Sequence, residues 1–292
     1  MLDIITTQTA SGSVSGLRRT RTLGLPVDAT FDTTGVLDAV ARNLASRTPY
    51  LVTFVNPSSC AVATSRPGYA DRLAAFDAVL PDGSGLSLAV RLIHHIPAAR
   101  ISFDTTSLAP KLLGLAEQYG YTVALVGGEP GSAEQAMQRL ADAFPMLRFV
   151  GAFHGYGDTD VRTRKLVALD PDIVICGMGS DHQEKMLLAL KGAGWTGCGF
   201  TCGGYLDQLN GGMDYYPAWI DRLNLRWAYR LAKEPRRLWR RYLLDYPPFV
   251  VAVVLAACQM SLRRRSDRLT EIRPSQSIEL PSRDAIGTGA IP

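Results

Sequence analysis

The chain is poor in cysteine, and it lacks an apolar run long enough to span a membrane. Its five cysteines form no paired spacing pattern, and they stand at positions 60, 176, 198, 202 and 258. Cys198 and Cys202 have no second Cys or His pair at metal-binding spacing nearby, so we interpret all five as reduced, packed thiols. The apolar run Phe249 to Cys258 is far shorter than the ~20 residues that cross a bilayer. It predicts a helix that is buried or lies on a membrane surface, and burial is the favoured interpretation.

Two further signals are missing, a secretory leader and the dinucleotide-binding fingerprint. The first 25 residues contain no apolar block preceded by basic residues, so we expect no secretory signal and a cytoplasmic protein. The pattern G-x-G-x-x-G is absent, because Gly177-Met178-Gly179 has no third glycine and no acidic residue stands about 20 positions after Gly127. A nucleotide-dependent oxidoreductase is therefore a remote alternative.

Apolar runs alternate with helical patterns along the 292 residues. Short buried strands are predicted at 50–55, 78–80, 121–126, 148–150, 172–176 and 199–202. Amphipathic helices are predicted between them, at 86–94, 107–118, 132–144 and 182–191. This rhythm is typical of an α/β fold, with a Rossmann-like, mostly parallel sheet flanked by helices. We expect four regions: a flexible N-terminal segment 1–28, an α/β core 29–221, a basic amphipathic helical appendage 222–263 and a disordered tail 264–292.

Basic residues concentrate in one segment near the C-terminal end. Residues 222–241 hold eight Lys or Arg against Glu234 alone, so this segment carries about +7 and the rest of the chain about −3. Helical spacing places five of them on one side of residues 225–242, which we call the basic ribbon: Arg226, Arg230, Lys233, Arg237 and Arg240. Pro235 should kink or split this helix, because it cannot donate a backbone hydrogen bond.

The basic ribbon predicts an anionic partner, unless it is only a solvated helix face. Nucleic acid, an acidic membrane surface and a nucleotide diphosphate all qualify. A nucleic-acid-binding module could use the ribbon for phosphates and its tryptophans for stacking. The rest of the chain has no recognisable nucleic-acid motif and is not basic, so we expect no nucleic acid partner.

Polar or glycine-rich residues follow several of the predicted strands. Asn56 follows the first, Asp82-Gly83-Ser84-Gly85 the second, and Gly127 to Gly131 the third. Ligands of open parallel sheets bind beyond the carboxyl ends of the strands, and backbone N–H groups at helix starts favour anions. These loops therefore indicate a phosphate-binding rim, although glycines there can also serve only to turn the chain. Asp82 is a candidate general base, with a helix N-cap as its plainer role.

The other polar motifs are weaker evidence for a functional site. Asp170-Pro171-Asp172 resembles a metal-binding Asp-x-Asp, but it precedes its strand and so belongs to the wrong edge of the sheet. We interpret Asp170 and Asp172 as turn and strand-entry residues. His154 and His182 are loop residues, each equally suited to a hydrogen-bonding or a catalytic role.

The order of motifs resembles the WecG/TagA/CpsF glycosyltransferases, glycosyltransferase family 26, over roughly residues 30 to 250. The motifs that carry the resemblance are FVNPSS at 54–59, LPDGSG at 80–85, Arg100, LVGGEPGSAE at 125–134, FVGAFHGYG at 149–157, PDIVICGMG at 171–179, HQEK at 182–185, CGGYLDQLNGG at 202–212, YYPAW at 215–219 and the basic ribbon. The resemblance implies transfer of a sugar from a UDP-sugar to a polyprenyl-diphosphate-linked sugar at the membrane. It also implies inversion at the anomeric centre, with no metal and no cofactor.

The resemblance assigns roles to particular residues. Asp82 matches the proposed base, and Asn56, Arg100 and Gln183 match polar residues of the cleft. Three arginines match those of an appendage thought to close over the nucleotide diphosphate: Arg230, Arg237 and Arg240. We add four candidate substrate-binding residues from the same motifs: Gly127, Gly128, Gly179 and Glu184.

Several positions depart from the family pattern, and they affect which donor sugar we expect. Arg100 is followed by Ile-Ser-Phe-Asp, and Asp181-His182 and Arg226 replace the usual residues. The departures look most like the GumM-type branch of exopolysaccharide assembly, so UDP-glucose is the first expected donor and a UDP-N-acetylhexosamine the second. We expect a protein at the inner face of the cell membrane, with an acidic lipid surface as a partner and a homo-oligomer as an open alternative.

Overall fold

Six strands form one parallel sheet in the order β4-β3-β8-β7-β5-β6. The computed structural model describes residues 17–212, 220, 226–233, 235–240, 243–244 and 246–271. The strands of the sheet are β3 (Tyr50–Val55), β4 (Ala78–Pro81), β5 (Thr122–Gly127), β6 (Arg148–Phe153), β7 (Ile173–Gly177) and β8 (Cys198–Thr201). The α/β prediction is confirmed, and each predicted strand lies in this sheet.

Helices cover both faces of the sheet, which explains why its strands are continuous apolar runs. Every residue of β3 is buried. Tyr50 and Val52 pack into the core on one face, and Leu51 and Val55 into the core on the other. A strand buried on both sides needs apolar residues at successive positions, because alternating polar residues would lose their water without gaining partners.

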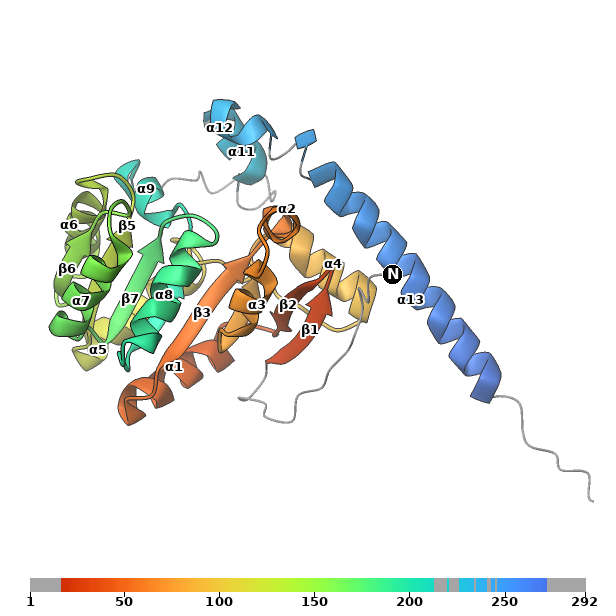
Figure 1. Cartoon of the computed structure of the whole chain (residues 1–292), viewed down its shortest axis with the longest axis horizontal. Helices are drawn as coiled ribbons and strands as arrows, with labels where there is room; N and C mark the ends of the chain where they lie inside the picture. The colour runs from red at the N-terminus through yellow and green to blue at the C-terminus, as the bar shows by residue number, and fades with distance from the viewer. Residues whose placement is uncertain are drawn as a thin grey trace, which may run out of the picture.

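Two layers of helices enclose the sheet (Figure 1). The first face is covered by α1 (Thr34–Ser46), α5 (Leu108–Tyr119), α6 (Ser132–Ala143) and α9 (Tyr205–Asn210). The second face is covered by α2 (Pro57–Ser65), α3 (Tyr69–Ala74), α4 (Ser84–His94), α7 (Thr159–Leu169) and α8 (His182–Gly192). The four predicted amphipathic helices correspond to α4, α5, α6 and α8.

An antiparallel hairpin precedes the core, formed by β1 (Arg18–Thr22) and β2 (Leu25–Ala29). It corrects the expectation of a flexible segment for residues 18–28, while residues 1–16 lie outside the described part. Leu25 and Val27 are fully buried, which anchors the hairpin. Asp28 accepts two hydrogen bonds from Arg19, at 2.9 and 2.7 Å, and one from Val79 N–H at 2.7 Å. The hairpin therefore also covers the outer edge of β4.

The C-terminal region contains α11 (Arg226–Lys233), α12 (Pro235–Arg240) and α13 (Tyr246–Glu271). Pro235 is the first residue of α12, so the predicted split of the basic ribbon is confirmed. Helix α13 continues past the expected start of the tail, which corrects the boundary at 264 for residues 264–271. Five of these eight residues are Arg, Leu or Glu, which are good helix formers, and none is proline. Residues 272–292 lie outside the described part of the chain.

Helix α13 has one buried and one exposed apolar side. Phe249, Val253 and Ala256 are buried in the core, on the side of α13 that contacts α4 and α2. Four apolar side chains on the other side are 55–58% exposed, and we call them the outer face of α13: Val250, Val251, Val254 and Leu255. The apolar run is thus only half buried. Within the described ranges, none of the helices is long and apolar enough to cross a membrane.

A buried carboxylate fixes the helices beside the loop after β7. The side chain of Asp181 is 2% exposed and accepts hydrogen bonds from Lys185 at 2.7 Å, Arg72 at 2.7 Å and Arg66 at 3.2 Å. Burial acts to raise the pKa of Asp181, but together the three cationic donors outweigh it, so the pKa is lowered. Asp181 therefore joins the C-terminal end of α2 to α3 and α8.

The Asp181 cluster generates a stability prediction. Asp181→Asn should lower the free energy of unfolding by about 3 kcal/mol at neutral pH, because a buried group loses its charge opposite three cations. Asn can adopt the backbone conformation of Asp181, where φ is 74°, because Asn tolerates positive φ. Because the folded-state pKa of Asp181 is lowered, its contribution is complete above the ordinary value of 3.8 and is lost as pH falls through the folded-state value. Chemical denaturation across this pH range measures the difference.

Asp170→Asn is a matched control for Asp181→Asn. Asp170 also has positive φ, at 44°, but it pairs with Arg47 at an exposed site where both side chains are more than half exposed. Its loss should change stability by less than about 1 kcal/mol. Equal effects of the two variants, or a difference between them that does not shrink in acid, would contradict the role given to Asp181.

Candidate active site

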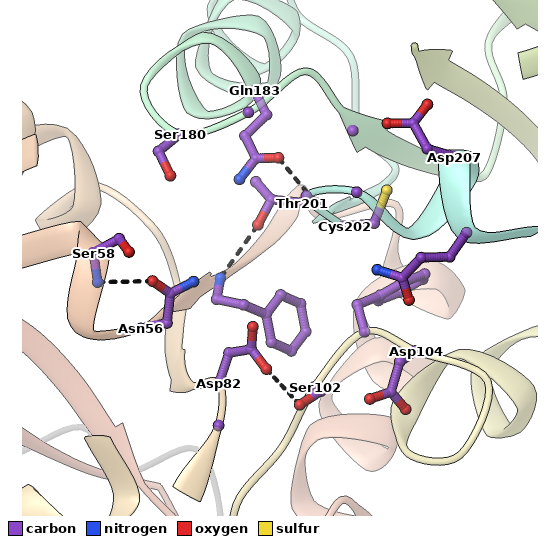
Figure 2. A pocket seen from close by; sticks show the side chains of 18 of the residues that line it. Asn56, Ser58, Asp82, Ser102, Asp104, Ser180, Gln183, Thr201, Cys202 and Asp207 are labelled. Carbon is purple, nitrogen blue, oxygen red and sulfur yellow. Dashed lines mark hydrogen bonds between the residues drawn. The ribbon is translucent and has the colours of Figure 1, made fainter. Parts of the chain in front are cut away.

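A cavity of about 1540 Å³ lies at the carboxyl edge of the sheet, where residues after all six strands line it. Figure 2 shows polar side chains from separate loops around it, among them Asn56, Asp82 and Gln183. The cavity is lined by residues of the strand ends and loops, including Phe54, Asn56, Ser58, Asp82, Ser84, Arg100, Ser102, Asp104, Gly128, Glu129, Ser132, Tyr156, Gly179, Ser180, His182, Gln183, Thr201 and Asp207. The sequence prediction of a ligand site at this edge therefore corresponds to a real concavity.

Helices α2, α4, α6 and α8 are among those that begin at the cavity wall. Ser58, Ser84, Ser132 and His182 lie in the first turns of α2, α4, α6 and α8, and all four line the cavity. A helix N-terminus carries a partial positive charge and N–H groups without a partner inside the helix. The wall therefore favours an anionic ligand although it also carries carboxylates.

Asp82 lies at the end of β4 and is held in place from two sides. Its backbone N–H donates to the carbonyl of Val55 at 2.7 Å. The hydroxyl of Ser102 donates to Oδ1 of Asp82 at 2.5 Å, and Figure 2 shows this bond below the cavity. Among the described residues Oδ2 of Asp82 has no hydrogen-bond partner, so this oxygen is available to a ligand.

Arg100 also lines the cavity, but its guanidinium is engaged by neighbours. Its Nε donates to the Ser102 hydroxyl at 3.2 Å, and its Nη2 donates to Asp104 at 3.0 Å. Asp104 is fixed in turn by the backbone N–H and the hydroxyl of Thr106, both at 2.9 Å. A chain of hydrogen bonds thus runs from Asp104 through Arg100 and Ser102 to Asp82.

Asn56 and Gln183 line the cavity and also hold its loops. Oδ1 of Asn56 accepts from Ser58 N–H at 3.0 Å and caps α2. Oε1 of Gln183 accepts from Gly203 N–H at 3.1 Å, which ties the start of α8 to the turn after β8. Gln183 is therefore a structural connection as well as a wall residue.

Glu184 lies behind the wall and does not reach the cavity. It is fully buried and accepts hydrogen bonds from Thr53 at 3.1 Å, Gln183 at 3.2 Å and the backbone N–H of Asp181 at 2.5 Å. Burial raises the pKa of Glu184, against the opposing effect of these donors. The geometry assigns it to support of the loop, and not to the substrate contact that its sequence position suggested.

The predicted glycines differ in what they do. A Cβ on Gly127 would lie 2.2 Å from the carbonyl oxygen of Gly177, so Gly127 permits close approach of β5 and β7. It does not line the cavity. Gly128 lines the cavity with φ of 67°, and a Cβ there would lie 2.5 Å from Cβ of Ser132. Gly179 also lines the cavity, with φ of 76° and open space around it.

The arginines of the basic ribbon are not brought into the described cavity wall. The side chains of Arg230 and Arg237 lie outside the described residues. Arg240 is exposed and contacts the ring of Trp239, 5.9 Å from its centroid. The C-terminal region instead adds an apolar part of the wall: Leu231, Leu243, Tyr246, Phe249 and Val250.

The Asp-x-Asp motif lies at the opposite edge, as expected from its place before β7. Asp172 accepts from the backbone N–H and the hydroxyl of Thr122, both at 2.8 Å. Asp170 pairs with Arg47. His154 is exposed and does not line the cavity, whereas His182 does.

Sequence reasoning missed Ser102, Asp104 and Asp207 as wall residues. The first two lie within four positions after Arg100, in the Ile-Ser-Phe-Asp run in which the chain departs from the family pattern. That departure was the available signal. Asp207, on α9, belongs to the motif CGGYLDQLNGG at 202–212, and its place in that motif was the available signal.

Comparison with known proteins identifies one family over most of the chain. The model described as "Glycosyl transferase WecG/TagA/CpsF family" matches residues 20–264. This span contains the whole sheet, the cavity and most of the C-terminal helices.

Individual relatives include two kinds of transferase. An N-acetylglucosaminyldiphosphoundecaprenol N-acetyl-beta-D-mannosaminyltransferase of Bacillus subtilis is 28% identical over 70% of this chain and 78% of its own. The enzyme of the same name from Bacillus spizizenii is 30% identical over the same shares. A UDP-Gal:alpha-D-GlcNAc-diphosphoundecaprenol beta-1,4-galactosyltransferase of Shigella boydii is 28% identical over 73% of this chain and 94% of its own.

The loop after β5 offers a paired test of the cavity wall. Gly128→Ala should destabilise the protein by about 1–3 kcal/mol more than Gly131→Ala, because its Cβ would overlap the start of α6. Gly131 is the control, since it has φ of 88° but open space at Cβ, so both variants share the strain of positive φ. Urea denaturation compares them. Equal stabilities would show that the loop relaxes freely and that the wall is not fixed at Gly128.

Proposed function

The chain belongs to the WecG/TagA/CpsF family and is a glycosyltransferase, and we propose that it moves a hexose from a UDP-sugar to a polyprenyl-diphosphate-linked sugar. UDP-glucose is the first proposed donor, for assembly of an exopolysaccharide or another bacterial surface polysaccharide. A UDP-N-acetylhexosamine is the second, because two of the relatives above are named as N-acetylmannosaminyltransferases. Relatives of both kinds are 28% identical to the chain, so identity does not choose between the donors.

The carboxyl-edge cavity is the observation that carries the proposal. Small ligands usually occupy pockets of about 300–1,000 Å³, and this cavity of about 1540 Å³ has room for a donor beside an acceptor sugar. The first turns of α6 and α8 suit a diphosphate. Asp82 lines the same cavity, and one of its carboxylate oxygens has no hydrogen-bond partner among the described residues.

We propose a single displacement that inverts the anomeric centre. An acceptor hydroxyl attacks the anomeric carbon while the bond from that carbon to the diphosphate oxygen breaks, and the electron pair leaves with UDP. Asp82 Oδ2 takes the hydroxyl proton, which then passes to solvent. The helix N-termini, with Arg230, Arg237 and Arg240 of the basic ribbon, would stabilise the charge on the departing diphosphate. Neither a metal nor a cofactor takes part in this proposal.

We also propose peripheral association with an acidic membrane, where a lipid-linked acceptor resides. The outer face of α13 exposes four apolar side chains, and Lys233, Arg236 and Arg240 are exposed nearby in the sequence. Apolar side chains can enter the lipid interface while basic groups meet anionic headgroups. Val250 belongs both to this face and to the cavity wall, so the face leads toward the site.

The catalytic proposal predicts the behaviour of Asp82→Asn. The variant should keep its fold and its affinity for UDP, measured by calorimetry, while sugar transfer falls about a hundredfold or more, because the amide cannot accept the proton. Asp71→Asn, at an exposed position of α3, is the control and should transfer at the normal rate. Near-normal turnover by Asp82→Asn would remove this residue from the mechanism.

The membrane proposal predicts the behaviour of a variant of the outer face. Val251→Asp with Leu255→Asp should bind acidic liposomes about tenfold more weakly or worse, because two apolar side chains no longer enter the interface. Transfer to a membrane-embedded acceptor should fall with it, whereas transfer to a short-chain, water-soluble acceptor should persist. Gln259→Asp with Ser261→Asp adds the same charge at exposed polar positions of α13 and is the control. Equal liposome binding by both double variants would contradict the proposal.

A further inference from the structure

Ser102 connects the proposed base to a cation that does not touch it. The Arg100 Nε donates to the Ser102 hydroxyl at 3.2 Å, and that hydroxyl donates to Asp82 at 2.5 Å. Arginine can only donate, so the serine oxygen must act as acceptor toward Arg100. The single proton of the hydroxyl is then directed to Asp82.

The loop that carries Ser102 is fixed on both sides. Ile101 is 1% exposed and its N–H donates to the carbonyl of Pro81 at 3.1 Å, beside Asp82. Phe103 is 5% exposed and packs against the rings of Phe54 and Tyr205, with centroids 5.9 and 5.5 Å away. Ser102 itself is 4% exposed, so its hydroxyl has little freedom to turn elsewhere.

The arrangement has a chemical consequence for the carboxylate. A direct ion pair between Arg100 and Asp82 would tie both carboxylate oxygens to a cation and weaken the base. The neutral hydroxyl of Ser102 instead occupies Oδ1 alone, while the charge of Arg100 is matched by Asp104 at 3.0 Å. Oδ2 of Asp82 is left to face a ligand.

We propose that Ser102 is a positioning residue for the reaction, which orients the Asp82 carboxylate toward the acceptor hydroxyl through a hydrogen bond that Arg100 polarises. This rests on the proposed function. In this role Ser102 acts through Asp82, and not through a contact of its own with a substrate. Its removal should therefore affect turnover and leave donor binding unchanged.

The test measures transfer by five variants, one of them Asp82→Asn alone. The donors are UDP-glucose, UDP-galactose and UDP-N-acetylmannosamine, and the acceptor is a synthetic lipid-diphosphate N-acetylglucosamine or glucose. With the donor that turns over, Ser102→Ala should lower kcat about ten- to a hundredfold, the effect of losing a hydrogen bond to a charged group. KM for the donor should stay within about twofold. Ser102→Thr keeps the hydroxyl and should recover most of kcat.

Two further variants separate positioning from general structural support. In Asp82→Asn, the added change Ser102→Ala should cause no further loss, because Ser102 acts only through the carboxylate. Ser107→Ala removes the acceptor of the Ser102 backbone N–H, at 3.3 Å, but leaves the hydroxyl in place, so kcat should be unchanged.

Distinct outcomes would overturn the inference or its premise. A wild-type kcat in Ser102→Ala would overturn the positioning role while the transferase function stands. The same would follow if Ser102→Ala lowered kcat by the same factor in the wild-type chain and in the Asp82→Asn variant. No transfer by the wild-type chain from any of the three donors would overturn the proposed function and this inference with it.

Discussion

The parallel alignment of six strands is the constraint on which the rest of the structure depends. Because every strand of the sheet runs in the same direction, the residues that follow the strands meet at one edge. The helices that start there turn their N-termini to the same place, so an anion-favouring wall and the Asp82 carboxylate arise together. The connections must then be tight, and Gly127 with Gly128 permits the close approach of β5, β7 and α6.

Much of the core could be predicted from the sequence because parallel strands buried on both faces are continuous apolar runs. Polar or glycine-rich residues just after such runs were expected at a ligand-binding edge, and Asn56, Asp82 and Gly128 do line the cavity. For Gln183 and Glu184, the sequence pattern could not predict which side chain lines the cavity. They are neighbours in the sequence, but helix α8 places Gln183 on the wall and Glu184 behind it, where Thr53 and the backbone N–H of Asp181 donate hydrogen bonds to Glu184.

The features that the sequence did not predict depend on contacts between residues far apart in the sequence. The role of Ser102 requires the loop after α4 to return to the end of β4, and the hairpin β1-β2 is stabilised by contacts with α4 and β4 that lie far away in the sequence. The half-buried state of α13 has the same origin, since an uninterrupted apolar run does not show which side meets the core. Each of these features combines local residue types with a distant partner.

The central claim is that the cavity transfers a sugar from a nucleotide donor to a lipid-linked sugar. The most direct measurement is the mass of the lipid-linked product after the purified full chain has been incubated with a lipid-diphosphate sugar acceptor in vesicles and, in separate reactions, with UDP-glucose, UDP-galactose or UDP-N-acetylmannosamine. The account predicts that one of these donors enlarges the acceptor by one sugar, with UDP released in equal amount. An acceptor of unchanged mass with every UDP-sugar offered, from a chain that is folded and bound to the vesicles, would contradict it.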